Sequence, residues 1–127
     1  MLVAVQDVYY NVVDMDRAVA FYRDLLGMRV LDSNPYWTSL EFFGARIGLH
    51  GAPGADASRP LPPLPHDQHG ALAGATLTLR STDLDADLAF LQGNDVRVIG
   101  RSDNPWGRLA VFLDSEGNIL KLMQAAT

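Results

Sequence analysis

The sequence predicts an α+β fold built from two βαβββ modules. Strand-like and helix-like segments follow one another in the same order in both halves of the chain, and the halves match at a separation of 69 residues. The matched pairs include Asp14 with Asp83, Phe21 with Phe90 and Trp37 with Trp106. A turn longer by two residues then shifts the separation to 71, which pairs His50 with Lys121. A repeat of this length indicates duplicated modules rather than a solenoid, whose repeats are typically about 20–50 residues long.

The first module covers about residues 1–50. Alternating Val and Tyr residues predict a strand within residues 2–13. Asp14 is the predicted N-cap of a helix over 15–26, because apolar residues recur there at helical spacing before Gly27 ends it. Three strands should follow, at 28–32, 36–43 and 46–50, with a turn at 43–45 joining the last two.

The second module covers about residues 74–127 and follows a Pro/Gly-rich loop at 51–73. Long loops of this kind are often linkers or lids over binding sites. A strand at 75–80 and a helix that begins after Asp83 and ends at Gly93 are predicted first. The remaining predicted elements are strands at 96–100, 108–113 and 119–124, with a turn at 114–118. Residues 1–127 are therefore expected to form a single domain.

Composition narrows the function classes. With 127 residues and 48% apolar residues, the chain can bury a core. The sequence contains no cysteine, which excludes disulfides, thiolate nucleophiles and cysteine-ligated zinc or iron–sulfur sites. A net charge of −5 has the wrong sign for binding nucleic acids or anionic membranes. No signal-peptide pattern and no apolar run of about 18 residues are present, so we expect a cytoplasmic protein.

Two segments resemble the vicinal oxygen chelate superfamily, which includes glyoxalase I, extradiol dioxygenases, fosfomycin-resistance enzymes and bleomycin-binding resistance proteins. Residues 12–27 resemble the strand–helix opening of that family, and residues 112–122 resemble its closing hairpin. The resemblance implies a glyoxalase-like, eight-stranded sheet shaped like half a barrel, and a homodimer with two symmetric sites. It does not imply one activity, because this scaffold carries several chemistries and also non-catalytic binders.

The resemblance also implies four metal-ligand positions, which fall here on Asp7, His50, Thr76 and Lys121. Only Asp7 and His50 are conventional ligands, since Thr76 is a poor one and Lys121 would place a cation beside the metal. We therefore expect the usual metal site to be dismantled and no cofactor to be bound. In the alternative, His66 and His69 of the loop complete a non-standard divalent-metal site with Asp7 and His50.

Strand alternation places a mixed polar and aromatic set on the sheet faces opposite the helices. Trp37 and Trp106 could join Tyr9 in stacking on a planar ligand, although such aromatics also serve as core or dimer contacts. The cations Arg46, Arg80 and Lys121 could bind a ligand anion, or could instead pair with Asp7 and Glu41. The candidate ligand-binding residues are Tyr9, Asn11, Trp37, Arg46, His50, Thr78, Arg80, Trp106, Lys121 and Met123.

Three functions remain open. The first is a small-molecule-binding protein without the usual metal, which holds an aromatic or polar metabolite or antibiotic in a dimer groove. The second is an enzyme: a lyase, isomerase or dioxygenase with a remodelled metal site, or a metal-free catalyst with Asp7 or His50 as general base. The third is a structural or regulatory dimer whose cavity is filled by its own side chains.

Overall fold

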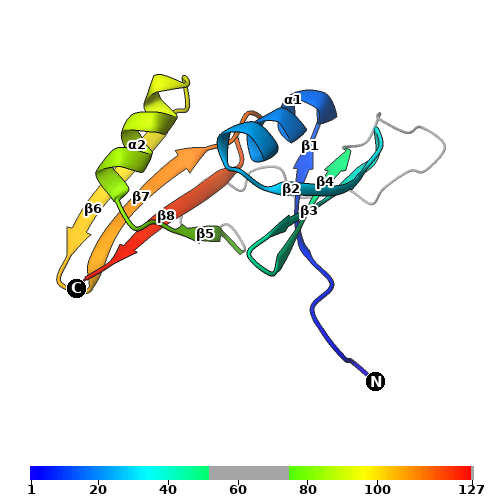
Figure 1. The fold of residues 1–127 in the computed structure, drawn as a ribbon, viewed down its shortest axis with the longest axis horizontal. Helices are drawn as coiled ribbons and strands as arrows, with labels where there is room; N and C mark the ends of the chain where they lie inside the picture. Colours follow the sequence, from blue (N-terminus) through cyan, green and yellow to red (C-terminus); the bar gives the residue numbers. More distant parts are fainter. Residues whose placement is uncertain (52–74, 127) are drawn as a thin grey trace. The chain divides into compact units, whose positions relative to one another are not determined.

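The structure is a computed structural model that describes residues 1–51 and 75–126. The chain divides into two compact units, unit 1 (Met1–Leu64) and unit 2 (Pro65–Thr127) (Figure 1). Most of the predicted loop, including His66 and His69, lies outside the described residues. The non-standard metal site that would use these two histidines therefore stays a prediction, as does the single domain over the whole chain.

Unit 1 contains a mixed four-stranded sheet with the strand order β1-β4-β3-β2. β1 is parallel to β4, whereas β2, β3 and β4 form two successive antiparallel pairs. The predicted βαβββ order is confirmed. The elements are β1 (Val8–Val12), α1 (Met15–Ala20), the π-helical turn η1 (Phe21–Leu25), β2 (Arg29–Ser33), β3 (Trp37–Phe42) and β4 (Ala45–Gly51).

The first helix begins where the sequence predicts but changes type before it ends. The Asp14 carboxylate accepts a hydrogen bond from the Arg17 N–H at 3.1 Å, as an N-cap does. After Ala20 the helix widens into η1, where the Leu26 N–H donates to the Phe21 carbonyl at 3.2 Å. Hydrophobic periodicity does not distinguish this wider turn from an α-helix. Gly27 has a φ of 78°, which explains why glycine ends the helix.

Unit 2 repeats the topology of unit 1, with the strand order β5-β8-β7-β6 and a parallel β5–β8 pair. The Asp83 side chain accepts a hydrogen bond from the Ala86 N–H, which confirms the second predicted cap. None of the described helices has the length and hydropathy needed to span a membrane. The elements are β5 (Leu77–Arg80), α2 (Leu84–Gly93), β6 (Val98–Asn104), β7 (Gly107–Leu113) and β8 (Ile119–Ala125).

The strand registers correct the predicted alignment of the two modules. Gly48 pairs with Tyr9 in unit 1, and Lys121 pairs with Thr78 in unit 2. Tyr9 and Thr78 are 69 residues apart, so Gly48, and not His50, is the counterpart of Lys121. The reason is that β6 and the turn after β7 are longer than their counterparts β2 and the two-residue turn after β3.

The two tryptophans are also not equivalent. Trp37 is the first residue of β3, whereas Trp106 lies in the turn between β6 and β7 and is 55% exposed. The match between them in the sequence is therefore a coincidence of spacing, produced by the longer β6 strand.

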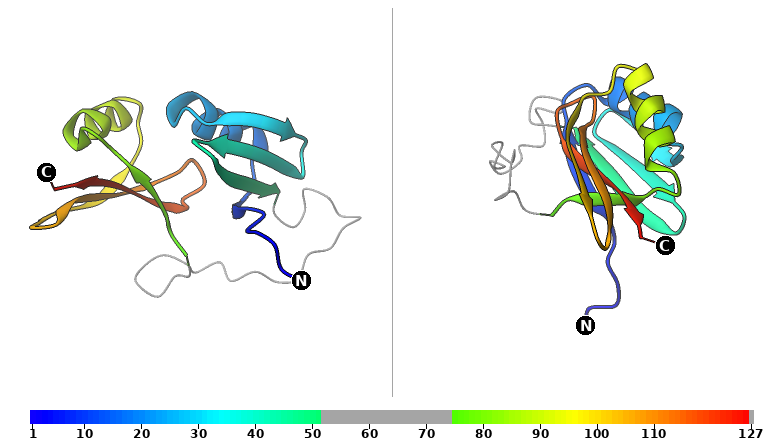
Figure 2. Two further views of the ribbon diagram at one scale, coloured as in Figure 1. Left: turned by 60° about the horizontal axis from the view of Figure 1, so that its bottom comes forward. Right: turned by 90° about the vertical axis from the view of Figure 1, so that its left-hand side faces the viewer.

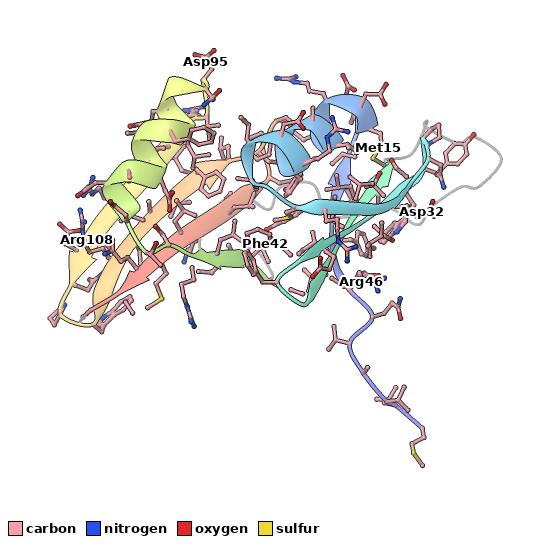
Figure 3. All side chains as sticks on the ribbon, in the orientation of Figure 1. Met15, Asp32, Phe42, Arg46, Asp95 and Arg108 are labelled. Atoms are coloured by element: carbon pink, nitrogen blue, oxygen red, sulfur yellow. The ribbon has the colours of Figure 1, made fainter. Side chains whose placement is uncertain are left out.

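Each helix packs on one face of its own sheet, and we call the opposite face the helix-free face (Figure 2). In unit 1, Met15 points from the start of α1 toward the sheet, where the buried Thr38 hydroxyl donates to its sulfur at 3.2 Å (Figure 3). Apolar residues fill both cores. The fully buried ones include Ala18, Tyr22, Leu40 and Leu49 in unit 1, and Leu84, Ala110, Phe112 and Leu120 in unit 2.

Candidate functional site

The helix-free face of unit 1 collects polar and aromatic residues, as strand alternation predicts. Ile47 and Leu49 of β4 are buried in the core, so the residues that alternate with them lie on the other face. The pairing register extends this alternation to β1 and β3. The face carries Tyr9 and Asn11 from β1, Trp37, Ser39 and Glu41 from β3, and Arg46, Gly48 and His50 from β4.

Tyr9, Trp37 and His50 form an aromatic cluster on this face. The ring centroid of Tyr9 lies 5.5 Å from that of Trp37 and 5.6 Å from that of His50. The ring centroids of Trp37 and His50 are 5.9 Å apart. The Tyr9 pairs meet edge to face, a favourable geometry for aromatic rings. Tyr9 is 45% exposed, and Trp37 and His50 are half-buried. The cluster therefore presents flat apolar surface together with polar ring atoms.

Gly48 makes room for the indole of Trp37. A Cβ atom built on Gly48 would overlap Cη2 and Cζ2 of Trp37 and would lie 3.0 Å from Cβ of Tyr9. Gly48 sits between Tyr9 and Ser39 in the sheet register. A glycine inside a strand often marks such a close approach. The missing side chain is what allows the indole to lie across β4.

Hydrogen bonds orient two members of the cluster. The Trp37 Nε1–H donates to the Ser39 hydroxyl at 2.9 Å. His50 Nδ1 lies 3.2 Å from Asn11 Oδ1, and because an amide oxygen only accepts, Nδ1 carries the proton in this arrangement. In the neutral ring, Nε2 is then the acceptor, and no hydrogen bond to it is found among the described residues. It can accept a proton or a hydrogen bond from a ligand.

At the other end of this face, the Glu41 carboxylate accepts hydrogen bonds from two neighbouring groups. The donors are the Gly44 N–H at 2.9 Å and Arg29 at 3.2 Å. The Gly44 hydrogen bond, the Arg29 side chain and the charge of Arg46 lower the pKa of Glu41 from its ordinary value. Arg46 lies opposite Glu41 at the β3–β4 hairpin. Glu41 thus makes its ion pair with Arg29, and the predicted ion pair between Arg46 and Glu41 is not found among the described residues.

The four family metal positions do not fit a divalent ion. His50 pairs with Asn11 of β1, and Asp7 lies four residues before Asn11, immediately ahead of that strand. At about 3.3 Å per residue, this places Asp7 roughly 13 Å away along the strand, too far for both to ligate one ion. Lys121 supplies a cation, and the exposed Thr76 precedes β5. Within the described residues, no group of three His, Asp or Glu side chains could hold a metal.

The helix-free face of unit 2 is more apolar than that of unit 1. Leu120 and Leu122 of β8 are buried in the core, which places Lys121 and Met123 on the other face. Trp106 has no ring partner among the described residues, and its predicted contact with a ligand stays a prediction. The register places on this face Thr78 and Arg80 from β5, Leu109 and Val111 from β7, and Ile119, Lys121 and Met123 from β8.

Two residues next to the aromatic cluster were not anticipated from the sequence. Gly48 and Ser39 lie directly under and beside the Trp37 indole. Their positions follow from strand alternation once the β3–β4 register is known, because Ser39 pairs with Gly48. A glycine between the apolar residues Ile47 and Leu49 was the available signal in the sequence.

Comparisons with known proteins agree with this architecture. The sequence model described as "Glyoxalase/Bleomycin resistance protein/Dioxygenase superfamily" matches residues 4–122. TnmS3, an antibiotic-binding protein from Streptomyces sp. CB03234, is 28% identical with a TM-score of 0.64, and the match covers 99% of this chain and 100% of TnmS3. No curated protein matches the sequence.

Two further solved structures share the fold at lower identity. Lactoylglutathione lyase from Agrobacterium tumefaciens is 20% identical with a TM-score of 0.72, and the match covers 95% of this chain and 92% of the lyase. The fosfomycin resistance protein FosX from Listeria monocytogenes is 12% identical with a TM-score of 0.73, and the match covers 99% of this chain and 96% of FosX.

Proposed function

Because this chain belongs to the glyoxalase/bleomycin resistance protein/dioxygenase superfamily, we propose that it is a small-molecule-binding protein that holds a planar aromatic ligand on the cluster of Tyr9, Trp37 and His50. The observation that carries this proposal is the partly exposed aromatic cluster beside Gly48. Stacking supplies affinity, and Asn11, Ser39 and the His50 Nε2 supply hydrogen-bonding atoms near the rings.

The antibiotic-binding relative TnmS3 supports a binding function, since it matches this chain over nearly the full length of both. The donor set at the family's metal positions favours binding without a metal, because Lys121 and Thr76 are unsuited to one. We further propose that the protein acts in the cytoplasm as a homodimer with two symmetric binding grooves. Light scattering on the purified protein tests the dimer directly, and a monomeric mass contradicts it.

The binding proposal can be tested with 2-naphthamide, a neutral planar probe, by isothermal titration calorimetry. Replacing Trp37 by Leu should weaken binding about tenfold or more, because stacking on one aromatic side chain is worth about 1–3 kcal/mol. Phe90→Ala is the matched control, since Phe90 is an exposed aromatic residue of α2. Failure of the wild-type protein to bind the probe, or unchanged affinity in the Trp37 variant, contradicts the proposal and favours a structural role with a filled face.

A second candidate is a metal-free enzyme with His50 as general base. The hydrogen bond between His50 Nδ1 and Asn11 favours this candidate. Because Nδ1 is engaged, the lone pair of Nε2 lies on the side of the ring that points away from Asn11, where it can accept a proton from a ligand. The step would be removal of a proton from an acidic C–H bond of the ligand. Proton NMR in deuterated water can follow exchange at such a position in bound ligands. No exchange with the wild-type protein, or equal exchange with His50→Gln, rejects this candidate.

A further inference from the structure

Charged side chains in unit 2 are divided between the two faces of its sheet. On the helix side, Arg101 and Arg108 form ion pairs with Asp85 of α2 at 2.6 and 3.0 Å. Arg108 also pairs with Asp103 at 3.1 Å, and Figure 3 shows it on this side, near the start of α2. Asp103 is the one acidic residue in the strands β5 to β8. The helix side therefore holds the strand carboxylate of the described part of unit 2, and its arginines are neutralised there.

The helix-free face of unit 2 carries two cations and no carboxylate on its strands. Neither Lys121 nor Arg80 forms an ion pair with any described residue. Arg80 pairs with Met123 and Lys121 pairs with Thr78, so the two cations are diagonal neighbours on the parallel strands β5 and β8. A strand spacing of about 4.8 Å and a two-residue rise of about 6.6 Å put their Cα atoms roughly 8 Å apart. Both side chains carry several N–H donors on long stems, so both can reach one anionic group from that distance.

The surroundings of Lys121 are apolar and aliphatic. Val111 lies beside it on β7, and Ile119 and Met123 flank it along β8 on the same face, all of them half-buried like Lys121 itself. An ammonium group beside apolar side chains attracts an anion more strongly than one surrounded by water, because the local dielectric constant is lower. None of the strand residues on this face is aromatic. The face therefore offers aliphatic contact area rather than a flat surface for stacking.

The counterpart position in unit 1 shows how the two helix-free faces differ. Lys121 is the structural counterpart of Gly48, whose missing side chain makes room for the Trp37 indole. Unit 2 has a long cationic side chain at this position instead. On a chain with a net charge of −5, two adjacent cations are a local exception that favours an anion. Charge complementarity thus identifies an anionic group, and the aliphatic neighbours identify the rest of the ligand as a hydrocarbon chain.

We propose that unit 2 binds an aliphatic carboxylate through Lys121 and Arg80, at a site formed by residues of unit 2 alone. The carboxylate accepts charge-assisted hydrogen bonds from the Lys121 ammonium and the Arg80 guanidinium. The hydrocarbon chain packs on Val111, Ile119 and Met123, where burial of its methylene groups adds affinity. No residue of the aromatic cluster in unit 1 takes part, so this site goes beyond the proposed function and does not depend on it.

Octanoate and its neutral analogue octanamide test the site, because they differ in the charge of the head group and share the hydrocarbon chain. Amide NMR spectra of the isotope-labelled protein, recorded during titration, give the affinity and locate the bound probe. Octanoate should shift the signals of β5 and β8 and bind about tenfold more tightly than octanamide. Lys121→Gln and Arg80→Gln should each weaken octanoate binding about tenfold, the usual effect of losing one charge-assisted hydrogen bond, and should leave octanamide within about twofold.

Arg101→Gln is the matched control, because it removes the same positive charge from an exposed ion pair on the helix side of the same unit. It should leave octanoate binding within about twofold, since exposed ion pairs contribute little to stability. Lys121→Arg keeps the positive charge and should retain most of the preference for octanoate. Raising the salt concentration from about 0.05 to about 0.5 M should weaken the octanoate complex and leave the octanamide complex unchanged.

Several results would overturn the proposal. One is that the wild-type protein fails to bind octanoate, or binds it no more tightly than octanamide. Another is that Lys121→Gln weakens both probes equally or neither, or that Arg101→Gln weakens octanoate as much as Lys121→Gln does. Octanoate-induced shifts confined to unit 1 would also contradict the site. The dispersion of the amide spectrum shows whether each variant is folded, and Arg80→Gln provides the same test if Lys121→Gln does not fold.

Discussion

Replacing Gly48 by Ala should destabilise the protein, although alanine ordinarily suits a strand better than glycine. The new Cβ would overlap the Trp37 indole, and forcing one extra carbon into a packed position costs about 1–3 kcal/mol. The change from Gly to Ala returns about 0.5–1 kcal/mol of backbone entropy. Displacement of the indole from Gly48 should also weaken its hydrogen bond to Ser39, worth about 1 kcal/mol. We therefore expect a net loss of about 1–3 kcal/mol in the free energy of unfolding.

Urea unfolding measures this loss, and a double-mutant cycle assigns its cause. In a Trp37→Ala background, Gly48→Ala should cost less than about 0.5 kcal/mol, because the indole is gone and only the 3.0 Å approach to Tyr9 Cβ remains. Tryptophan fluorescence of the single variant should shift to longer wavelength as the Trp37 indole moves toward water. The Gly48→Ala variant should also bind 2-naphthamide more weakly than the wild type.

Equal stability of Gly48→Ala and the wild type would refute this reasoning, because it would mean that the indole does not lie over Gly48. The same conclusion would follow if Gly48→Ala cost as much without Trp37 as with it. In that case the strain would come from Tyr9 or from the backbone, and Gly48 would not position the aromatic cluster.

Two further predictions concern the turns. Asp114→Ala should lower the free energy of unfolding by about 2–4 kcal/mol. The buried Asp114 carboxylate accepts hydrogen bonds from the Glu116 and Asn118 N–H groups at 2.8 Å and from Asn118 Nδ2 at 3.0 Å. A loss below about 1 kcal/mol in urea unfolding would contradict this prediction. Glu41 has a lowered pKa in the folded state, so its stabilising contribution is present above its ordinary value of 4.5 and is lost as the pH falls through the lower folded value. Thermal unfolding of Glu41→Gln should therefore depend less on pH than that of the wild type below pH 4.5, and identical pH profiles would show that Glu41 contributes nothing.

Local chemistry explains why most elements could be predicted from the sequence. Both helix starts follow from an aspartate whose carboxylate caps the first N–H groups, and both caps are observed. The hairpin turn at Phe43 and Gly44 needs two positive φ angles, 48° and 89°, and glycine supplies one of them without strain. The alternation that places Tyr9 and Asn11 on the same face of β1 is likewise a property of that strand alone.

The candidate site could be predicted only in part, because its geometry depends on pairing between strands. Alternation identifies the face that carries Asp7 and His50, but only the β1–β4 register shows that they are roughly 13 Å apart. Likewise, the repeat in the sequence aligned Lys121 with His50. The registers align it with Gly48 instead, because the sequence alignment allowed for the longer turn after β7 but not for the longer β6 strand.

By itself, the sequence determined the βαβββ repeat, the helix boundaries set by Asp14, Asp83 and Gly27, and the side of each strand that avoids the core. These features depend on contacts within about four residues along the chain or on simple alternation. Only the tertiary structure decided that the Trp37 indole lies over Gly48 and against Tyr9 and His50. It also decided that Lys121 forms no ion pair with the described residues. Those relations join residues far apart in the sequence, and hydrogen bonding between strands selects them from several registers that the same hydrophobic pattern allows.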